Sequence, residues 1–173
     1  AGVATVKASI DAMESSGATN VPEGMAWGWR AVSGGEPFVE GRADSEKGND
    51  KVVIVLTDGA NTYYTPSSLG YTDAAGVKST YSAYGYVGTK YNNGDPRIFL
   101  NTSSAVVKTN FVNGNYTSAL NEQFTALCNN AKAQGILVMT VSLDLSTSNS
   151  TEKGQVDALK ACSSESRFRK DGS

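Results

Sequence analysis

The sequence predicts an α/β fold with a mainly parallel sheet, and the alternation of two kinds of segment predicts it. Residues 52–56 and 136–143 are short apolar runs, of the kind found in parallel strands that are buried on both faces. Residues 3–14 and 117–134 place apolar side chains at helical spacing. Helices that alternate with apolar strands are typical of β-α-β units, whose strands run parallel.

The first expected helix spans residues 3–14. Its apolar positions are Val3, Val6, Ile10 and Met13, and their spacing predicts an amphipathic helix with one apolar stripe. The stretch SSGATN, which contains a glycine, is expected to end this helix in a loop.

A second helix is predicted over residues 21–32. Asn20 can cap its amino terminus, and Glu23 stands three residues later, as in a capping box. The helix carries two tryptophans, Trp27 and Trp29, which are either core residues or covered surface residues. We expect them to belong to the core.

The middle of the chain shows little periodicity. Residues 33–50 read as a loop rich in glycine and charge, and residues 60–115 form a long segment without clear helix or strand signals. All eight tyrosines lie between Tyr63 and Tyr116. Tyrosine-rich loops suit contact surfaces, but such a loop can equally cover its own domain, and both interpretations stay open.

The carboxyl-terminal third returns to a regular pattern. A helix over residues 117–134 is expected to end at Gly135, followed by the apolar strand 136–143. A short helix is expected over residues 152–161, and the stretch SRFRK at 166–170 is a candidate third strand.

Composition narrows the possible functions. The chain has 173 residues, a net charge of −2 and no histidine, which excludes Ser-His-Asp and Cys-His catalysis and histidine-ligated zinc within these residues. It is not basic enough for a nucleic-acid surface, and no apolar stretch is long enough to span a bilayer. Few charges, many Ser, Thr, Asn, Gly and Tyr residues and a start at Ala1 favour a processed or excised extracytoplasmic protein.

One carboxylate has a position that is typical of a site. Asp58 directly follows the apolar run 52–56 and Thr57, and ligands of open α/β sheets bind at the carboxyl ends of the strands. Asp58-Gly59 is also a common turn pair, so the position alone supports a turn as well as a site.

The order of these motifs resembles the von Willebrand factor A domain, in its TadG-like subgroup from tight-adherence pilus assembly. The stretches that carry the resemblance are GATNVPEGMAWGWRAVSGGEPFVEGR, KVVIVLTDGANT, LCNNAKAQGILVMTVSLDL and LKACSSESRFRKDGS. The resemblance implies a Rossmann-like three-layer fold, in which residues 1–173 form a single domain that is incomplete at its amino-terminal end. The Tyr-rich segment 60–115 would be an insertion.

The resemblance also implies a divalent-cation site, usually for Mg²⁺, at the carboxyl edge of the sheet, with Thr19 and Asp58 among its ligands. The family's Asp-x-Ser-x-Ser loop does not precede Thr19, so we expect this chain alone to bind Mg²⁺ weakly or not at all. Residues 144–148 spell Asp-x-Ser-x-Ser after an apolar strand, either as a permuted metal loop or as common turn material.

The function implied is a non-enzymatic adhesion or protein-binding module of a bacterial surface or pilus-assembly protein. Its partner would be a protein, and a segment outside this chain would anchor it to the membrane, facing the periplasm or the cell surface. The composition and the resemblance both favour a disulfide between Cys128 and Cys162, with two buried thiols as the alternative.

Two other functions are weighed against this one. A Mg²⁺-dependent phosphatase of the haloacid-dehalogenase type also places an aspartate after a buried strand, but Leu56 stands where its nucleophile is needed. A purely structural module without metal is the third interpretation.

Overall fold

The computed structural model describes residues 2–171 except for positions 44, 64–81, 86–93 and 166–167. Much of the Tyr-rich segment and the first two residues of the candidate strand SRFRK therefore lie outside the described residues. The elements, in chain order, are α1 (Val3–Asp11), α2 (Val21–Val32), β1 (Val52–Thr57), the short 3₁₀ helix η2 (Arg97–Phe99), α3 (Asn113–Ala133), β2 (Leu137–Leu143), α4 (Ser150–Cys162) and β3 (Phe168–Asp171).

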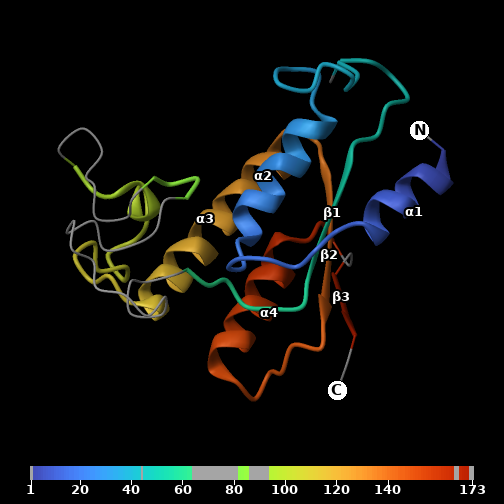
Figure 1. The fold of residues 1–173 in the computed structure, drawn as a ribbon. Helices are drawn as coiled ribbons and strands as arrows, with labels where there is room; N and C mark the ends of the chain where they lie inside the picture. The colour runs from blue at the N-terminus through green and yellow to red at the C-terminus, as the bar shows by residue number, and fades with distance from the viewer. Residues whose placement is uncertain (1, 44, 64–81, 86–93, 166–167, 172–173) are drawn as a thin grey trace.

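The three strands form one parallel sheet in the order β1-β2-β3. Figure 1 shows α2, α3 and α4 together on one side of this sheet and α1 on the other. The predicted α/β class with a parallel sheet is confirmed, and the arrangement is consistent with a Rossmann-like three-layer fold.

Local signals set the boundaries of α2 better than those of α1 and α3. The Asn20 side chain accepts a hydrogen bond from the backbone N–H of Glu23 at 3.1 Å, so α2 begins where its cap predicts. The helix α1 ends at Asp11, earlier than the expected residue 14. The helix α3 begins at Asn113, earlier than the expected residue 117. Its N-cap residue, Val112, makes no side-chain capping hydrogen bond, so the sequence gives no capping signal at this boundary. It is followed by Gly135 in the left-handed region, with φ at +79°.

The main core lies between the sheet and the three helices α2, α3 and α4. Val53 and Val55 of β1 point into it, as does Val138 of β2. The other buried members of this cluster come mostly from the helices: Val21, Met25, Phe124, Cys128, Ala131, Ile136, Leu145, Val156, Ala158, Leu159 and Cys162.

The expectation that residues 52–56 are buried on both faces is wrong for the described structure. Burial alternates along β1, and Ile54 and Leu56 are 64% and 59% exposed on the face turned away from α2, α3 and α4. The reason is that α1, the described helix on that side, buries none of its residues. Its predicted apolar stripe exists, but none of its residues is buried against another described element.

The expectation that both tryptophans belong to the core is also wrong. Trp27 is 45% exposed, with the Arg30 guanidinium 4.8 Å from its ring centroid and Phe38 against its edge. Trp29 is partly buried and packs against the main core. A cation over an exposed ring stabilises by about 0.5–1 kcal/mol, which favours a covered surface position for Trp27.

A second hydrophobic cluster joins the Tyr-rich segment to the start of α3. It contains Tyr63, Ile98, Phe99, Val106, Tyr116, Ala119 and Leu120. The Lys108 ammonium holds the surrounding loop, because it donates to the carbonyl oxygens of Phe99 and Thr102 at 2.7 and 3.1 Å. The described parts of residues 60–115 therefore contribute to the core of their own domain.

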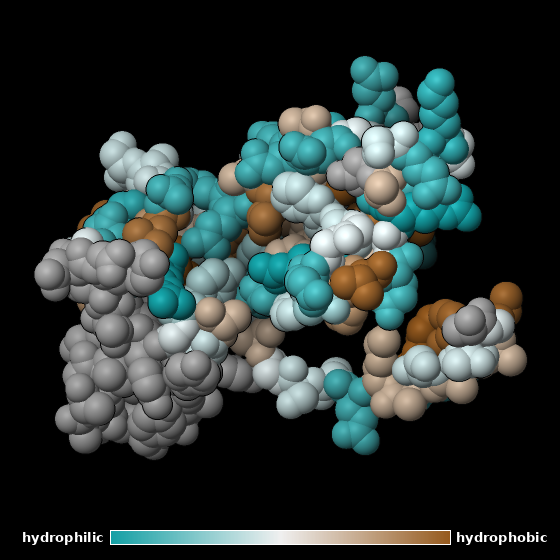
Figure 2. Space-filling view, turned by 90° about the horizontal axis from the view of Figure 1, so that it is seen from above, coloured by the Kyte–Doolittle hydropathy of each residue, from teal (hydrophilic) through white to brown (hydrophobic). Residues whose placement is uncertain are grey.

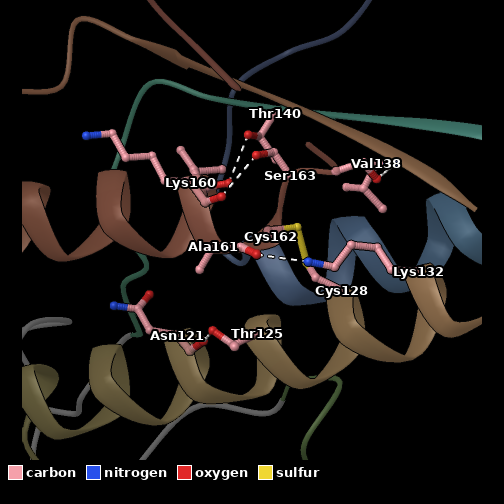
Figure 3. Close-up of a disulfide and its surroundings, with 12 residues drawn as sticks. Asn121, Thr125, Cys128, Lys132, Val138, Thr140, Lys160, Ala161, Cys162 and Ser163 are labelled. Atoms are coloured by element: carbon pink, nitrogen blue, oxygen red, sulfur yellow. Dashed lines mark hydrogen bonds between the residues drawn. A yellow bond between two sulfur atoms is a disulfide. The ribbon is translucent and has the colours of Figure 1, made fainter. Parts of the chain in front are cut away.

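The structure joins Cys128 of α3 to Cys162 of α4 in a disulfide (Figure 3). Nearby, the Lys132 ammonium donates to the carbonyl oxygen of Ala161 at 2.9 Å, which adds a second tie between the two helices. The disulfide predicted from the sequence is present, and the interpretation as two free thiols is wrong.

Candidate functional site

The carboxyl end of β1 turns sharply at Asp58 and Gly59. The Thr57 hydroxyl donates to the carbonyl oxygen of Gly59 at 2.9 Å and accepts from its N–H at 3.3 Å, so it closes the turn. Asp58, at the tip, is exposed. The turn therefore presents this carboxylate to solvent at the edge of the sheet where ligands of α/β folds bind.

Thr19 lies beside this turn. Its backbone N–H donates to the Thr62 hydroxyl at 2.9 Å, and its carbonyl oxygen accepts from the Thr62 N–H at 2.9 Å. A Cβ atom built on Gly59 would lie 3.3 Å from the Thr19 hydroxyl oxygen, so the two loops are in close contact. The structure thus places the Thr19 loop against Gly59, the residue that follows Asp58 in the chain.

Asn61 holds the site in place, and the sequence analysis did not find it. It is fully buried, and its side chain accepts from the Val21 N–H at 2.8 Å and donates to the Asn121 side chain at 2.8 Å. Its backbone N–H donates to the Gln155 side chain at 3.1 Å, and its carbonyl oxygen accepts from the Thr117 hydroxyl. One side chain and its backbone therefore connect the loop after β1 to α2, α3 and α4.

The cap of α2 links this site to the Tyr-rich segment. The Tyr84 hydroxyl lies 3.5 Å from the Asn20 side-chain oxygen and donates to it. Burial raises the pKa of Tyr84 to about 12, and the hydrogen bond to Asn20 opposes this shift. Tyr84 is therefore neutral at physiological pH and serves as a donor rather than as an acid or base.

The Asp-x-Ser-x-Ser stretch at 144–148 forms a turn that leads into α4, whose N-cap is Asn149. The backbone of Asp144 has φ at +51°, and its N–H donates to the carbonyl oxygen of Asp171. The Ser146 N–H donates to the Glu152 carboxylate at 2.7 Å, at the start of α4. These hydrogen bonds are the ones expected of common turn material, and Asp144 itself is exposed at the end of β2.

The donors available for a cation are few. Among the residues that the structure describes, no group of three or more His, Cys, Asp or Glu side chains is placed to hold a metal ion. Thr19 and Asp58 offer one hydroxyl and one carboxylate, both oxygen donors of the kind that Mg²⁺ prefers. This donor set has the right chemistry for Mg²⁺ but supplies only part of a six-ligand shell.

Comparison with protein-family models, with curated proteins and with solved structures finds no match for this chain. The assignment of a function therefore depends on the residues and their geometry.

Proposed function

We propose that this chain is a non-enzymatic protein-binding module of a bacterial surface or pilus-assembly protein. It would contact its partner at the carboxyl edge of the sheet, through a divalent cation held in part by Thr19 and Asp58. The observation that supports the proposal is the contact between the Thr19 loop and Gly59, which follows the exposed Asp58 in the turn at the carboxyl end of β1.

The incomplete donor set fits a cation that is shared with a ligand. Mg²⁺ needs six oxygen ligands at about 2.0–2.1 Å and usually keeps several waters. A carboxylate of the partner, together with waters, would fill positions that Thr19 and Asp58 leave open. The chain alone would then bind Mg²⁺ weakly, and the partner would strengthen that binding.

The disulfide supports an extracytoplasmic location. Disulfides persist in oxidising compartments such as the periplasm and the cell surface, and the bond between Cys128 and Cys162 is of the kind found there. In the part of the chain that the structure describes, no helix is long and apolar enough to cross a bilayer. The proposal includes membrane anchoring through a segment outside these residues.

Titration calorimetry with Mg²⁺ and Mn²⁺ tests the cation site. We expect millimolar binding by the wild-type chain that is lost in Asp58→Ala and weakened in Thr19→Val. Asp144→Ala is the matched control, because it removes an exposed carboxylate from the neighbouring strand end. Micromolar binding that is lost only in Asp144→Ala would favour the permuted metal loop, and binding indifferent to all three substitutions would place the cation elsewhere.

Adhesion and turnover assays separate the functions. Retention of the chain on the surface of piliated bacteria that requires Mg²⁺ and Asp58 supports the binding module. Hydrolysis of a phosphate ester that Asp58→Asn abolishes would instead assign an enzyme. If neither adhesion nor hydrolysis is observed, the interpretation as a purely structural module is favoured.

A further inference from the structure

A pocket lies between α2, α3 and the loop that contains η2, apart from the site described above. Its volume is about 340 Å³, which lies within the range of pockets that bind small ligands. Its apolar walls are Pro22 and Ala26 of α2, Ala126 and Leu127 of α3, and Leu100, which follows η2. A ligand with an apolar body would therefore shield these walls from water.

The pocket opens on the side of α2 that faces away from the sheet. Gly28 faces the sheet, since a Cβ built on it would lie 3.0 Å from the Val53 side chain. Ala26 lines the pocket and lies on nearly the opposite face of the helix, because each residue turns an α-helix by about 100°. A further strand of this domain beside β1 would therefore lie on the other side of α2 and would not enter the pocket.

The helix α1 does not reach the pocket either. It lies on the opposite side of the sheet from α2 and α3 (Figure 1), and in Figure 2 it stands away from the rest of the molecule. On α3, Phe124 and Cys128 pack in the main core and do not line the pocket. The pocket is therefore a feature of the outer surface of the two helices.

Two carboxylates lie at the pocket, and they differ in their partners. Both oxygens of Glu122 accept from Ser103, at 2.6 Å from its N–H and at 2.7 Å from its hydroxyl. In a complete capping box the Glu23 carboxylate would accept from the Asn20 N–H. Among the described residues it accepts no hydrogen bond and forms no ion pair, and instead it lines the pocket. The half-buried Glu23 carboxylate therefore favours a cation beside it.

Other polar residues at the pocket are compatible with such a cation. Arg97 also lines the pocket, but it has an interaction partner of its own. Tyr84 contributes an aromatic ring to the lining, and aromatic rings attract cations. The pocket thus combines apolar walls with one carboxylate that has no described counter-charge.

We propose that this pocket binds a small organic cation, in which an ammonium group is carried on an apolar body. The apolar body packs between Ala26 and Ala126, and the ammonium donates to the Glu23 carboxylate. An anionic ligand would be repelled by Glu23. A purely apolar ligand would bury this carboxylate without a hydrogen-bond partner, which is costly.

This binding needs no metal, so it is measured in EDTA and its failure leaves the proposed cation site untouched. The probe is phenethylamine, and phenethyl alcohol is the matched control because it has the same body without the charge. Titrations followed by amide chemical shifts in ¹H–¹⁵N NMR spectra measure both. We expect saturable binding of the amine, with shifts at Ala26 and Leu127, that is at least about tenfold tighter than binding of the alcohol, since charge-assisted hydrogen bonds are the stronger ones.

Three results of these titrations would overturn the proposal. The first is no saturable binding of the amine, including the case in which a lysine of this chain already occupies the pocket. The second is equal binding of the amine and the alcohol. The third is tighter binding of Nα-acetyl-lysine methylamide than of phenethylamine, which would make the pocket a site for a lysine side chain of another protein.

Glu23→Gln tests the partner of the ammonium. It removes the charge and keeps the backbone N–H that donates to the Asn20 side chain, so α2 should keep its cap. We expect amine binding to weaken by about tenfold and alcohol binding to stay unchanged. Glu14→Gln, which changes an exposed carboxylate outside the pocket, is the control and should alter neither. Unchanged amine binding in Glu23→Gln would refute the assigned contact.

Ala126→Leu tests the position of the apolar body. The larger side chain fills the pocket, so we expect both probes to bind at least about tenfold more weakly. Ala133→Leu, at an exposed alanine of the same helix that does not line the pocket, is the matched control. Leucine is a good helix former, and circular dichroism checks that both variants fold. Amine binding that is unchanged in Ala126→Leu would place the ligand elsewhere and overturn the proposal.

Discussion

The two faces of β1 differ sharply in how far their side chains are buried. Val53 and Val55 are less than 10% exposed beneath α2, whereas Ile54, between them, is 64% exposed. The side chains are equally apolar, so the residues themselves do not explain the difference. What differs is whether a described element packs above them. The variants below test whether the exposed face is also uncovered in solution, in order of decreasing expected effect.

The largest expected effect comes from placing a carboxylate on each face of β1. Val55→Asp buries a charge with no partner in the main core, and we expect it to cost on the order of 4 kcal/mol or more, enough to unfold a marginal domain. Ile54→Asp keeps its charge in water and should change stability by less than about 1 kcal/mol. Urea unfolding followed by tryptophan fluorescence measures both. Equal losses would show that both faces of β1 are covered in solution.

The disulfide joins α3 to α4 on the covered side of the sheet, and its removal is expected to have the second largest effect on stability. In the chain-entropy model, removing a bridge between residues separated by 34 positions costs about 3–4 kcal/mol. We expect the double variant Cys128→Ala, Cys162→Ala to lose about this much in urea unfolding under non-reducing conditions. Mass spectrometry after alkylation of the denatured wild type supplies the control, and two modified thiols without reductant would contradict the bond.

The sequence predicts the parts of this fold whose causes are local. The helix α2 is predicted residue by residue because its cap, Asn20, and its first turn lie within four positions of each other. The continuous apolar run of β1 identifies a strand, but it cannot say what covers each face, since the covering helices come from distant parts of the chain. The exposed face of Ile54 could therefore be found only in the structure.

The residues of the candidate site also fall into those that the sequence identifies and one that only the structure reveals. Asp58 is found from the strand before it, and Thr19 from a resemblance. Asn61 was missed because its side-chain and backbone partners lie 40 to 94 positions away, and an asparagine after Asp-Gly looks like ordinary turn material. Its burial is the signal, and only the folded chain provides it.

The third test replaces Asn61, which lies in the loop that follows the carboxyl end of β1. Asn61→Ala removes one buried and one partly buried side-chain hydrogen bond and leaves the Val21 N–H without its acceptor, so we expect a loss of about 2–3 kcal/mol. Asn130→Ala, on the exposed side of α3, is the matched control and should be close to neutral. Chemical denaturation measures both. A neutral Asn61→Ala would mean that the loop after β1 is held by its backbone alone.

The smallest expected effect is on α1, and it is the most direct test of the uncovered side. Ile10 lies in the apolar stripe of α1 and is 56% exposed, with no described element packed over it. Ile10→Lys should therefore change the free energy of unfolding by no more than about 0.5 kcal/mol, as expected for a surface substitution. A buried isoleucine, by contrast, usually stabilises the folded state by more than this. Met25→Lys, in the buried face of α2, is the contrast and should be severely destabilising, because its side chain is fully enclosed.

A loss above about 1 kcal/mol in Ile10→Lys would show that α1 packs against the sheet in solution, since only a buried isoleucine can lose that much. In that case the exposed face of β1 would be covered by the chain's own first helix.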